Sequence, residues 1–388
     1  MINLMCAQLN QHGDNKNMIH WQEKQELQQA LWCSEAGNMP PKKIVVIDDT
    51  IPADDAYKWA CEGAAMLYRG DFQNAKQLLQ AITRRVDRKL AKPLDSLNAT
   101  FHQHRARQIQ RANITHKILI ELQHGQCNLR RAPDVKEAVT GAMMENVPAR
   151  MVLSLRELLG MIGAHEWRKK GVFIEALQTN IHAHYGVYSP IRGEYLDLIA
   201  NKEVDWVNIA FDIGTGTGVI AAVLAKLGVD KIIATDNQPR ALICAQENIV
   251  RLGLQRQVQV MKADLFPPNQ RADLIICNPP WLPAKANASI EHAVYDPNSQ
   301  MLKNFLNGVQ SHLNPKGEAW LIMSNLAEHL GLRSHVDLLS WIKNAGLNVI
   351  EKKDIAPRHS KVSDRSDPLY EARSQEVTSL YRLNLSIS

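Results

Sequence analysis

The stretch of sequence that decides the fold reads IAFDIGTGTG and occupies residues 209–218. Its apolar first half predicts a buried strand, and the apolar run that follows it predicts a helix. Between the two, Gly214, Gly216 and Gly218 allow a tight turn and let a ligand approach the backbone closely. The dinucleotide-binding fingerprint needs its third glycine at position 219, where this chain has Val219. The stretch therefore predicts a strand, a ligand-binding glycine loop and a helix in succession.

Short apolar runs continue to alternate with helical patterns towards the C-terminus. Runs of this kind, separated by helices, are typical of buried parallel strands. The predicted strands are Ile209–Ile213, Ile232–Thr235, Gln257–Met261, Leu274–Cys277, Trp320–Met323, Asn348–Ile355 and Thr378–Leu385, and the predicted helices include Val219–Leu227 and Pro239–Leu252. The sequence thus predicts an α/β fold for residues 201–388, with a doubly wound, seven-stranded, Rossmann-like sheet.

Polar residues follow the predicted strands, at the end of a parallel sheet where ligands bind. Asp236 ends the second strand about 20 residues after the glycines, where a carboxylate can accept hydrogen bonds from both hydroxyls of a ribose. Asp264 follows the third strand. The candidate cofactor-binding residues are Asp212, Gly214, Thr215, Gly216, Gly218, Asp236, Asn237, Asp264, Leu265 and Asn278.

The fourth predicted strand runs directly into Asn278, Pro279, Pro280 and Trp281. The corner resembles the N-P-P-[Y/F/W] signature of methyltransferases that act on exocyclic amines or carboxamides, which implies an adenine N6 or a carboxamide nitrogen as the acceptor. Such a nitrogen is a poor nucleophile because its lone pair is delocalised into a π system. Asn278 Oδ1 and the Pro279 carbonyl can each accept one N–H, which holds the nitrogen and favours the positive charge that develops on it. The prolines stiffen the corner, and Trp281 offers a flat face for stacking. These four residues are the predicted catalytic residues, acting on a planar NH2 nitrogen.

The two motifs together resemble those of class I S-adenosylmethionine-dependent methyltransferases. Over residues 150–388 the layout resembles the HemK-type branch. The resemblance implies S-adenosyl-L-methionine as cofactor, with Asp264 bonded to the adenine amino group and the Leu265 backbone N–H beside it. It also implies a β-hairpin linker and a helical domain ahead of the catalytic domain.

Residues 166–200 are predicted to form that linker and an entry helix. Strand-like runs flank Gln178-Thr179-Asn180 at Val172–Leu177 and Ile181–Tyr188, and a helix begins at Glu194–Ala200. The stretch from 185 to 194 is similar to a segment that lines the cofactor pocket in the HemK-type branch. This similarity implies that Tyr188, Pro190 and Arg192 lie near the methionine end of the cofactor. A packed hairpin without ligand contact is the alternative.

Residues 1–165 are predicted to form a mostly helical substrate-recognition region. A helical pattern begins near Asp55 and includes Ala64, Leu67 and Tyr68, and Leu153–Gly163 predicts one more helix. Within residues 84–131, eleven cations face three carboxylates, a local excess of +8. Such a segment is either a solvated helix face or a docking surface for phosphate backbones or a ribosomal particle. The cations are Arg84, Arg85, Arg88, Lys89, Lys92, Arg105, Arg107, Arg111, Lys117, Arg130 and Arg131.

The composition sets few further limits. A chain of 388 residues with 45% apolar residues suffices for two or three domains, and its net charge of +5 permits an acidic partner without requiring one. The six cysteines form no C-x-x-C pair, which predicts reduced, buried thiols and no metal site. The sequence contains neither a signal peptide nor a run long enough to span a membrane, so we expect a cytoplasmic protein.

The acceptor stays open at this point. The HemK-like layout favours the carboxamide of a glutamine in a translation protein, whereas the basic segment and Trp281 favour adenine N6 of RNA or DNA, stacked on the indole. A small-molecule amine and a non-catalytic binding module are further alternatives. A polar insertion at 357–374, near His359, either touches the substrate or forms an exposed loop.

Overall fold

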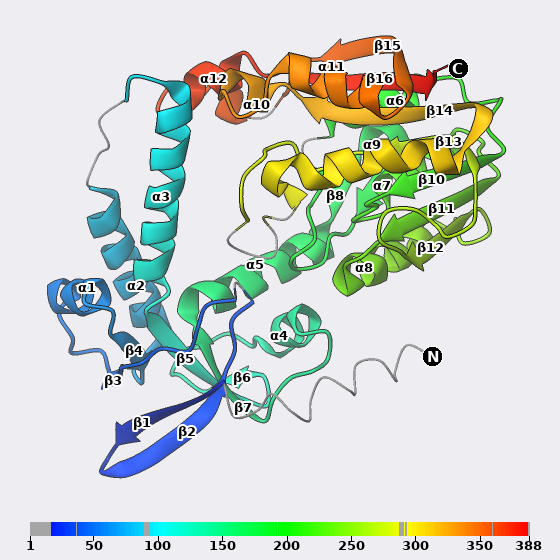
Figure 1. The fold of residues 1–388 in the computed structure, drawn as a ribbon. Helices are drawn as coiled ribbons and strands as arrows, with labels where there is room; N and C mark the ends of the chain where they lie inside the picture. The colour runs from blue at the N-terminus through cyan, green and yellow to red at the C-terminus, as the bar shows by residue number, and fades with distance from the viewer. Residues whose placement is uncertain are drawn as a thin grey trace. The chain divides into compact units, whose positions relative to one another are not determined.

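A computed structural model describes residues 17–35, 37–88, 94–191, 193–286, 291, 293–358 and 360–386. The chain divides into two compact units (Figure 1). The first comprises residues 1–92 and 104–166, and the second comprises residues 93–103 and 167–388. Helices α3 (Leu97–Thr115) and α5 (Leu155–Lys170) contain residues of both units. Each unit is described by itself.

The second unit is built on a seven-stranded sheet with the order β12-β11-β10-β13-β14-β16-β15. Every pair from β12 to β14 is parallel, and β16 pairs antiparallel with both β14 and β15. The strands are β10 (Ile209–Ile213), β11 (Lys231–Asp236), β12 (Val258–Lys262), β13 (Ala272–Cys277), β14 (Leu313–Ser324), β15 (Leu347–Ile355) and β16 (Thr378–Leu385). The predicted seven-stranded Rossmann-like sheet is confirmed.

Helices cover both faces of this sheet (Figure 1, green to red). One core cluster joins the sheet to α6, α7 and α8, and a second joins its other face to α9 and α11. The helices are α6 (Glu194–Ala200), α7 (Val219–Lys226), α8 (Pro239–Arg251), α9 (Gln300–His312), α10 (Leu326–His329), α11 (His335–Asn344) and α12 (Tyr370–Ser374). Almost every residue of α7 is buried, which explains why its sequence is apolar all round.

The strand order reverses its direction between β10 and β13. From β10 the chain builds outward to β11 and β12, and then returns to the other side of β10 to place β13 and β14. Such a reversal leaves a crevice at the carboxyl ends of the two central strands, which is where open α/β sheets bind ligands. The glycine stretch follows β10 and the N-P-P-W corner follows β13, so both motifs lie at this point.

The linker contains the predicted hairpin in a shorter form. Strands β8 (Val172–Ile174) and β9 (Thr179–Ile181) pair antiparallel, and Gln178 turns the chain with a φ of 54°. The predicted second strand ends at Ile181, because the residues after it form a turn in which Val187 N–H donates to the His184 carbonyl. Helix α6 begins and ends where it is predicted.

The first unit is not the mostly helical domain that the sequence predicts. It is an α/β unit on a seven-stranded mixed sheet with the order β1-β2-β7-β5-β4-β3, and β6 pairs with β5. The strands are β1 (Met18–Glu23), β2 (Glu26–Trp32), β3 (Ile44–Ile47), β4 (Ala65–Tyr68), β5 (Ile118–Gln123), β6 (Gln126–Cys127) and β7 (Arg150–Ser154). The helices are α1 (Ala53–Cys61), α2 (Phe72–Asp87) and α4 (Lys136–Ala142), with parts of α3 and α5.

The misassigned residues include the short strand β4 and Leu153, which was predicted to begin a helix and lies in β7. Leu67 and Tyr68, assigned to a helix from their spacing, lie in β4, where all four residues are buried. A run of four apolar residues is too short to show a strand periodicity, so it was read as part of the neighbouring helical pattern. Asp71 then starts α2, since its side chain accepts the backbone N–H groups of Gln73 and Asn74.

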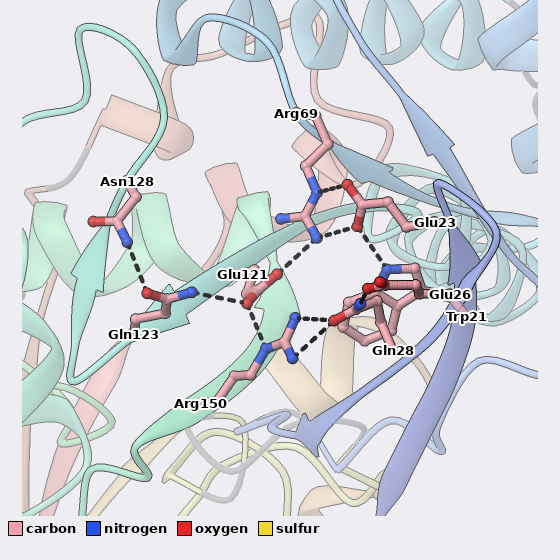
Figure 2. Close-up of polar contacts among 9 residues, drawn as sticks. All are labelled: Trp21, Glu23, Glu26, Gln28, Arg69, Glu121, Gln123, Asn128 and Arg150. Atoms are coloured by element: carbon pink, nitrogen blue, oxygen red, sulfur yellow. Dashed lines mark hydrogen bonds and ion pairs between the residues drawn. The ribbon is translucent and has the colours of Figure 1, made fainter.

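Charged side chains of this sheet pair with one another (Figure 2). The Arg69 guanidinium contacts the carboxylates of Glu23 and Glu121, each at 2.7 Å, and Arg150 Nε donates to Glu121 Oε1 at 2.6 Å. Both guanidinium groups lie over the ring of Trp21, at 5.9 and 5.3 Å. A buried carboxylate needs such partners to remain charged, so this network is part of the architecture of the sheet.

Several cations of the basic segment also have acidic partners within the first unit. Arg85 pairs with Asp54 and Arg111 pairs with Asp87, both at 2.7 Å. Arg131 contacts Asp71 at 2.6 Å. Lys89 and Lys92 lie outside the described residues, as does His359 of the polar insertion. Asp54 and Asp71 lie outside the segment and partly neutralise its local excess of +8, whereas Asp87 lies within it and is already counted in that excess.

The remaining expectations concern the insertion, the thiols and membrane spans. Residues 357–374 include α12, whose Ala372 is buried with Leu369 against Phe101, so this part is not simply an exposed loop. Five cysteines are free, of which Cys61 is exposed and so departs from the expectation of burial, while Cys6 lies outside the described residues. Among the helices that the structure describes, none is long and apolar enough to cross a bilayer.

Candidate functional site

The glycine loop crosses the carboxyl end of β10 in a left-handed backbone conformation. Gly214, Gly216 and Gly218 have φ values of 71°, 55° and 80°, a region that side chains with a Cβ rarely adopt. At Gly214 an added Cβ would lie 3.2 Å from Met301 Cε, whereas nothing lies within 4 Å of the corresponding point at Gly216. The loop is thus closed underneath by α9 and open at its middle glycine.

Asp212 is buried beneath the loop and is only half satisfied. Its Oδ2 accepts the Thr215 hydroxyl at 2.6 Å and the Ala221 N–H at 3.1 Å. Its Oδ1 is buried and has no hydrogen-bond partner among the described residues. Burial raises the pKa of Asp212 to about 6, although the bonds from Thr215 and Ala221 lower it. A buried acceptor without a donor is costly, so a bound group with an N–H or ammonium would satisfy it.

Asp236 lies at the end of β11 and ties that strand to the glycine loop. Its Oδ2 accepts the Gly216 N–H at 3.1 Å and its Oδ1 accepts the Gln238 N–H at 2.9 Å. Burial raises the pKa of Asp236, and these backbone donors lower it. Each carboxylate oxygen keeps further acceptor capacity, so the predicted contact with ribose hydroxyls is compatible with this geometry. Asn237, next to it, is exposed.

Asp264 and Leu265 form a tight turn after β12. Phe266 N–H donates to the Asp264 carbonyl at 3.1 Å, and Leu265 has a φ of 67°, a strained value for a leucine. The turn is anchored by Thr235, whose hydroxyl donates to the Leu265 carbonyl at 2.6 Å. Asp264 is exposed, so its carboxylate is available to a ligand. Strain that is held in place at a strand end is consistent with a binding role.

The N-P-P-W corner begins immediately after β13. Pro279 is buried, whereas Asn278, Pro280 and Trp281 are half-buried. Trp281 Nε1–H donates to Asn278 Oδ1 at 3.0 Å. After the corner the chain makes an excursion from Leu282 to Val294, and the Leu282 N–H donates to the Val294 carbonyl at 3.1 Å, which joins its two ends. Residues 287–290 and 292, within this excursion, lie outside the described residues.

The residues before α6 differ in how well they fit their predicted role. Tyr188 is 40% exposed and lies near Tyr195, since it contributes to the raised pKa of that buried phenol. Pro190 is buried, and Arg192 lies outside the described residues. The structure therefore brings Tyr188 towards α6 and leaves the contact of Pro190 with a ligand as an expectation.

Three residues of the site were missed by the sequence analysis. Thr235 joins two loops, because its hydroxyl binds the Leu265 carbonyl and its own carbonyl accepts the Thr215 N–H at 2.8 Å. Met301 lies under Gly214. Tyr195, at the start of α6, is buried and lies close to Asn278. The positions of all three depend on long-range packing, which the sequence does not show.

The donor and acceptor groups at this edge fit S-adenosyl-L-methionine. That molecule offers an ammonium group, two ribose hydroxyls and an adenine amine as donors. The site offers the buried Oδ1 of Asp212 and the carboxylates of Asp236 and Asp264, together with an open glycine loop. Among the described residues, no group of three or more His, Cys, Asp or Glu side chains could hold a metal ion.

Comparison with known proteins identifies relatives for this part of the chain. Residues 180–345 match the family described as methyltransferase small domain. A release factor glutamine methyltransferase of Koribacter versatilis is 33% identical over 140 residues, which cover 32% of this chain and 48% of the relative. A ribosomal protein L11 methyltransferase of Vibrio vulnificus is 32% identical over 90 residues, which cover 23% of this chain and 30% of the relative.

The chain spans less than half the length of these two relatives. A crystal structure of ribosomal protein L11 methylase from Lactobacillus delbrueckii subsp. bulgaricus is 17% identical to it, with a TM-score of 0.38. That match covers 54% of this chain and 87% of the other.

Proposed function

From the match of residues 180–345 to the methyltransferase small domain family, we propose that the chain is an enzyme whose cofactor is S-adenosyl-L-methionine. It transfers a methyl group to the side-chain carboxamide nitrogen of a glutamine in a translation protein. The observation that carries the proposal is the placement of the Asn278-Pro279 corner beside the glycine loop, at the reversal of strand order. A nitrogen held at the corner would lie next to a cofactor held by the loop.

The residues that would hold the cofactor line the ends of β10, β11 and β12. They are Asp212, Gly214, Thr215, Gly216, Gly218, Asp236, Asn237, Asp264 and Leu265, with Tyr188 and Pro190 before α6. When bound, the cofactor supplies a methyl group on a sulfonium, which is already activated for transfer. The protein therefore has mainly to align the acceptor nitrogen with that methyl group.

The corner residues act on the acceptor. Asn278 Oδ1 and the Pro279 carbonyl each accept one N–H of the carboxamide, which fixes the nitrogen and favours its developing positive charge. Pro279 and Pro280 cannot donate and have fixed φ, so the carbonyl stays free and the corner stays rigid. No strong general base is required, because the nitrogen becomes acidic once it is methylated, and its proton can then leave to water.

Two observations favour a protein acceptor over a nucleic acid. The relatives in the comparison are named for release factor glutamine and ribosomal protein L11. The adenine alternative depended partly on the cations of residues 84–131. Three of these, Arg85, Arg111 and Arg131, already form ion pairs with carboxylates of the first unit. A phosphate-binding surface needs cations that can replace counterions. A translation-protein acceptor would place the reaction in the cytoplasm.

The proposal is tested by the fate of a labelled methyl group. The full chain is incubated with labelled S-adenosyl-L-methionine and an extract of cells that lack the protein, and the product is digested with protease or with nuclease. We expect label in macromolecular material that protease alone releases, as N5-methylglutamine after hydrolysis. Label released only by nuclease would instead identify adenine N6, and label confined to small molecules would identify a free amine.

A further inference from the structure

The indole of Trp281 donates a hydrogen bond to the proposed catalytic amide. Trp281 Nε1 lies 3.0 Å from Asn278 Oδ1. An indole N–H can only donate, so the atom that faces it must be the amide oxygen and not the amide nitrogen. This contact therefore fixes the orientation of the Asn278 carboxamide, which chemistry alone would leave free to flip by half a turn.

Trp281 is itself held by packing on two sides. The ring is half-buried and contacts both core clusters, one on each face of the sheet. An aromatic ring restrained in this way has little rotamer freedom left. It can therefore act as a fixed point against which a neighbouring polar group is oriented.

A second side chain, which is buried, lies close to the same amide. Tyr195, at the start of α6, lies close to Asn278, since burial raises the pKa of Tyr195 and the Asn278 side chain lowers it. Tyr195 is buried in the cluster that also contacts Trp281. The carboxamide is thus bonded to an indole and has a buried phenol close to it, each from a different part of the chain.

The Asn278 amide oxygen can bond Trp281 and the acceptor nitrogen at the same time. A carboxamide oxygen has two lone pairs, of which Trp281 occupies one. The other remains for an N–H of the acceptor. A tyrosine or phenylalanine in this place has no ring N–H and cannot make the contact, so the choice of tryptophan at position 281 has a chemical consequence.

We propose that Trp281 is a positioning residue, which acts through Asn278 by holding its amide oxygen towards the acceptor nitrogen. The inference rests on the proposed function, because it assigns the orientation of a group that this function uses. It also differs from a stacking role for Trp281, in which the ring face rather than the N–H contributes to activity.

The first test replaces the indole N–H while keeping an aromatic face. The variant is Trp281→Phe, and Trp206→Phe, at a half-exposed tryptophan of the same unit, is the matched control. We expect Trp281→Phe to lower the rate of label transfer to saturating extract protein by about 100-fold, since small misplacements cost this much. The extract concentration for half-maximal rate and the calorimetric affinity for S-adenosyl-L-methionine should not change, and the control should behave like wild type.

The second test asks whether the effect passes through Asn278. In the Asn278→Ala background, adding Trp281→Phe should cause no further loss of rate, because the group that it orients is already absent. A purely structural role predicts an additional loss in the double variant. A stacking role predicts that Trp281→Phe alone keeps the wild-type rate or weakens acceptor binding instead.

A third readout does not depend on the acceptor. The chain contains eight tryptophans, so the indole N–H resonance that disappears in Trp281→Phe can be assigned by nuclear magnetic resonance. We expect its hydrogen exchange to be slow in the wild type and faster in Asn278→Ala. If Trp281→Phe has wild-type activity and Asn278→Ala is inactive, the positioning role of Trp281 is wrong but the proposed function stands. Absence of label transfer by the wild type overturns the proposed function and the inference with it.

Discussion

The two sheets of this protein treat the acidic residues at their strand ends in opposite ways. In the first unit, the Arg131 guanidinium beside Asp71 holds the pKa of that carboxyl far below its usual range. Burial raises the pKa of Glu121, but hydrogen bonds from Arg150 and Arg69 more than reverse this rise. In the second unit, burial raises the pKa of both Asp212 and Asp236, since only hydroxyl and backbone donors oppose it.

This difference separates carboxylates that are paired within the fold from carboxylates whose acceptor oxygens are left open to a ligand. Asp71 and Glu121 have arginine partners, and a paired carboxylate has little to offer a bound molecule. At Gly70, the residue before Asp71, a Cβ would collide with the Asp49 carboxylate, so this turn requires glycine. The second sheet leaves an acceptor of Asp212 without a donor, and a perturbed, incompletely satisfied carboxyl group at a strand end is typical of a functional site.

The largest effect should come from the corner of the second sheet. Asn278→Ala removes one of the two proposed acceptors for the nucleophilic nitrogen, so we expect the rate of methyl transfer to fall by about 10²–10³-fold, as for the loss of one preorganised polar group elsewhere. Affinity for S-adenosyl-L-methionine, measured by calorimetry, should survive. A variant that turns over like wild type would remove the proposed catalytic role from the corner.

A smaller effect, on stability alone, is expected in the first sheet. Glu121→Leu leaves Arg69 and Arg150 without their shared carboxylate, and breaking a buried pair in this way costs about 3 kcal/mol. The free energy of unfolding from urea titration should fall accordingly, while affinity for S-adenosyl-L-methionine stays the same. Glu26→Leu is the matched control, because Glu26 is exposed on the same sheet and surface changes stay within about 0.5 kcal/mol. Loss of cofactor affinity in Glu121→Leu would contradict a purely structural role.

The smallest effect is a pH dependence of cofactor affinity. Asp212 has a pKa of about 6, and a bound ammonium or N–H donor favours its charged form. Affinity should therefore be complete above that pH and weaken up to about tenfold per unit as the pH falls below it. Calorimetry from pH 7.5 to about 5 measures this slope.

The control for that slope is Asp212→Asn, which cannot titrate and should bind with the same affinity across the range. Asp236 faces the same loop and its pKa is also raised. If the affinity of Asp212→Asn still falls with pH, Asp236 and not Asp212 is the group that titrates.

The sequence alone determined most of the second sheet. Strands β10, β13 and β16 and helices α6, α7 and α8 were predicted within a few residues, because long apolar runs alternate there with clear helical patterns and glycine punctuation. The spacing of the glycines and the four residues after β13 also marked the candidate site. These signals are local, so they can be read before the chain folds.

Only the tertiary structure decided the nature of the first unit and the environment of each site residue. Strands β4 and β7 are too short to show a period, and they become strands because neighbouring strands pair with them. The missing partner of Asp212 Oδ1, the anchoring of Leu265 by Thr235 and the contact of Trp281 with Asn278 are equally invisible in the sequence. Hydrogen bonding and burial depend on which atoms folding brings together, and residue types and spacing do not specify them.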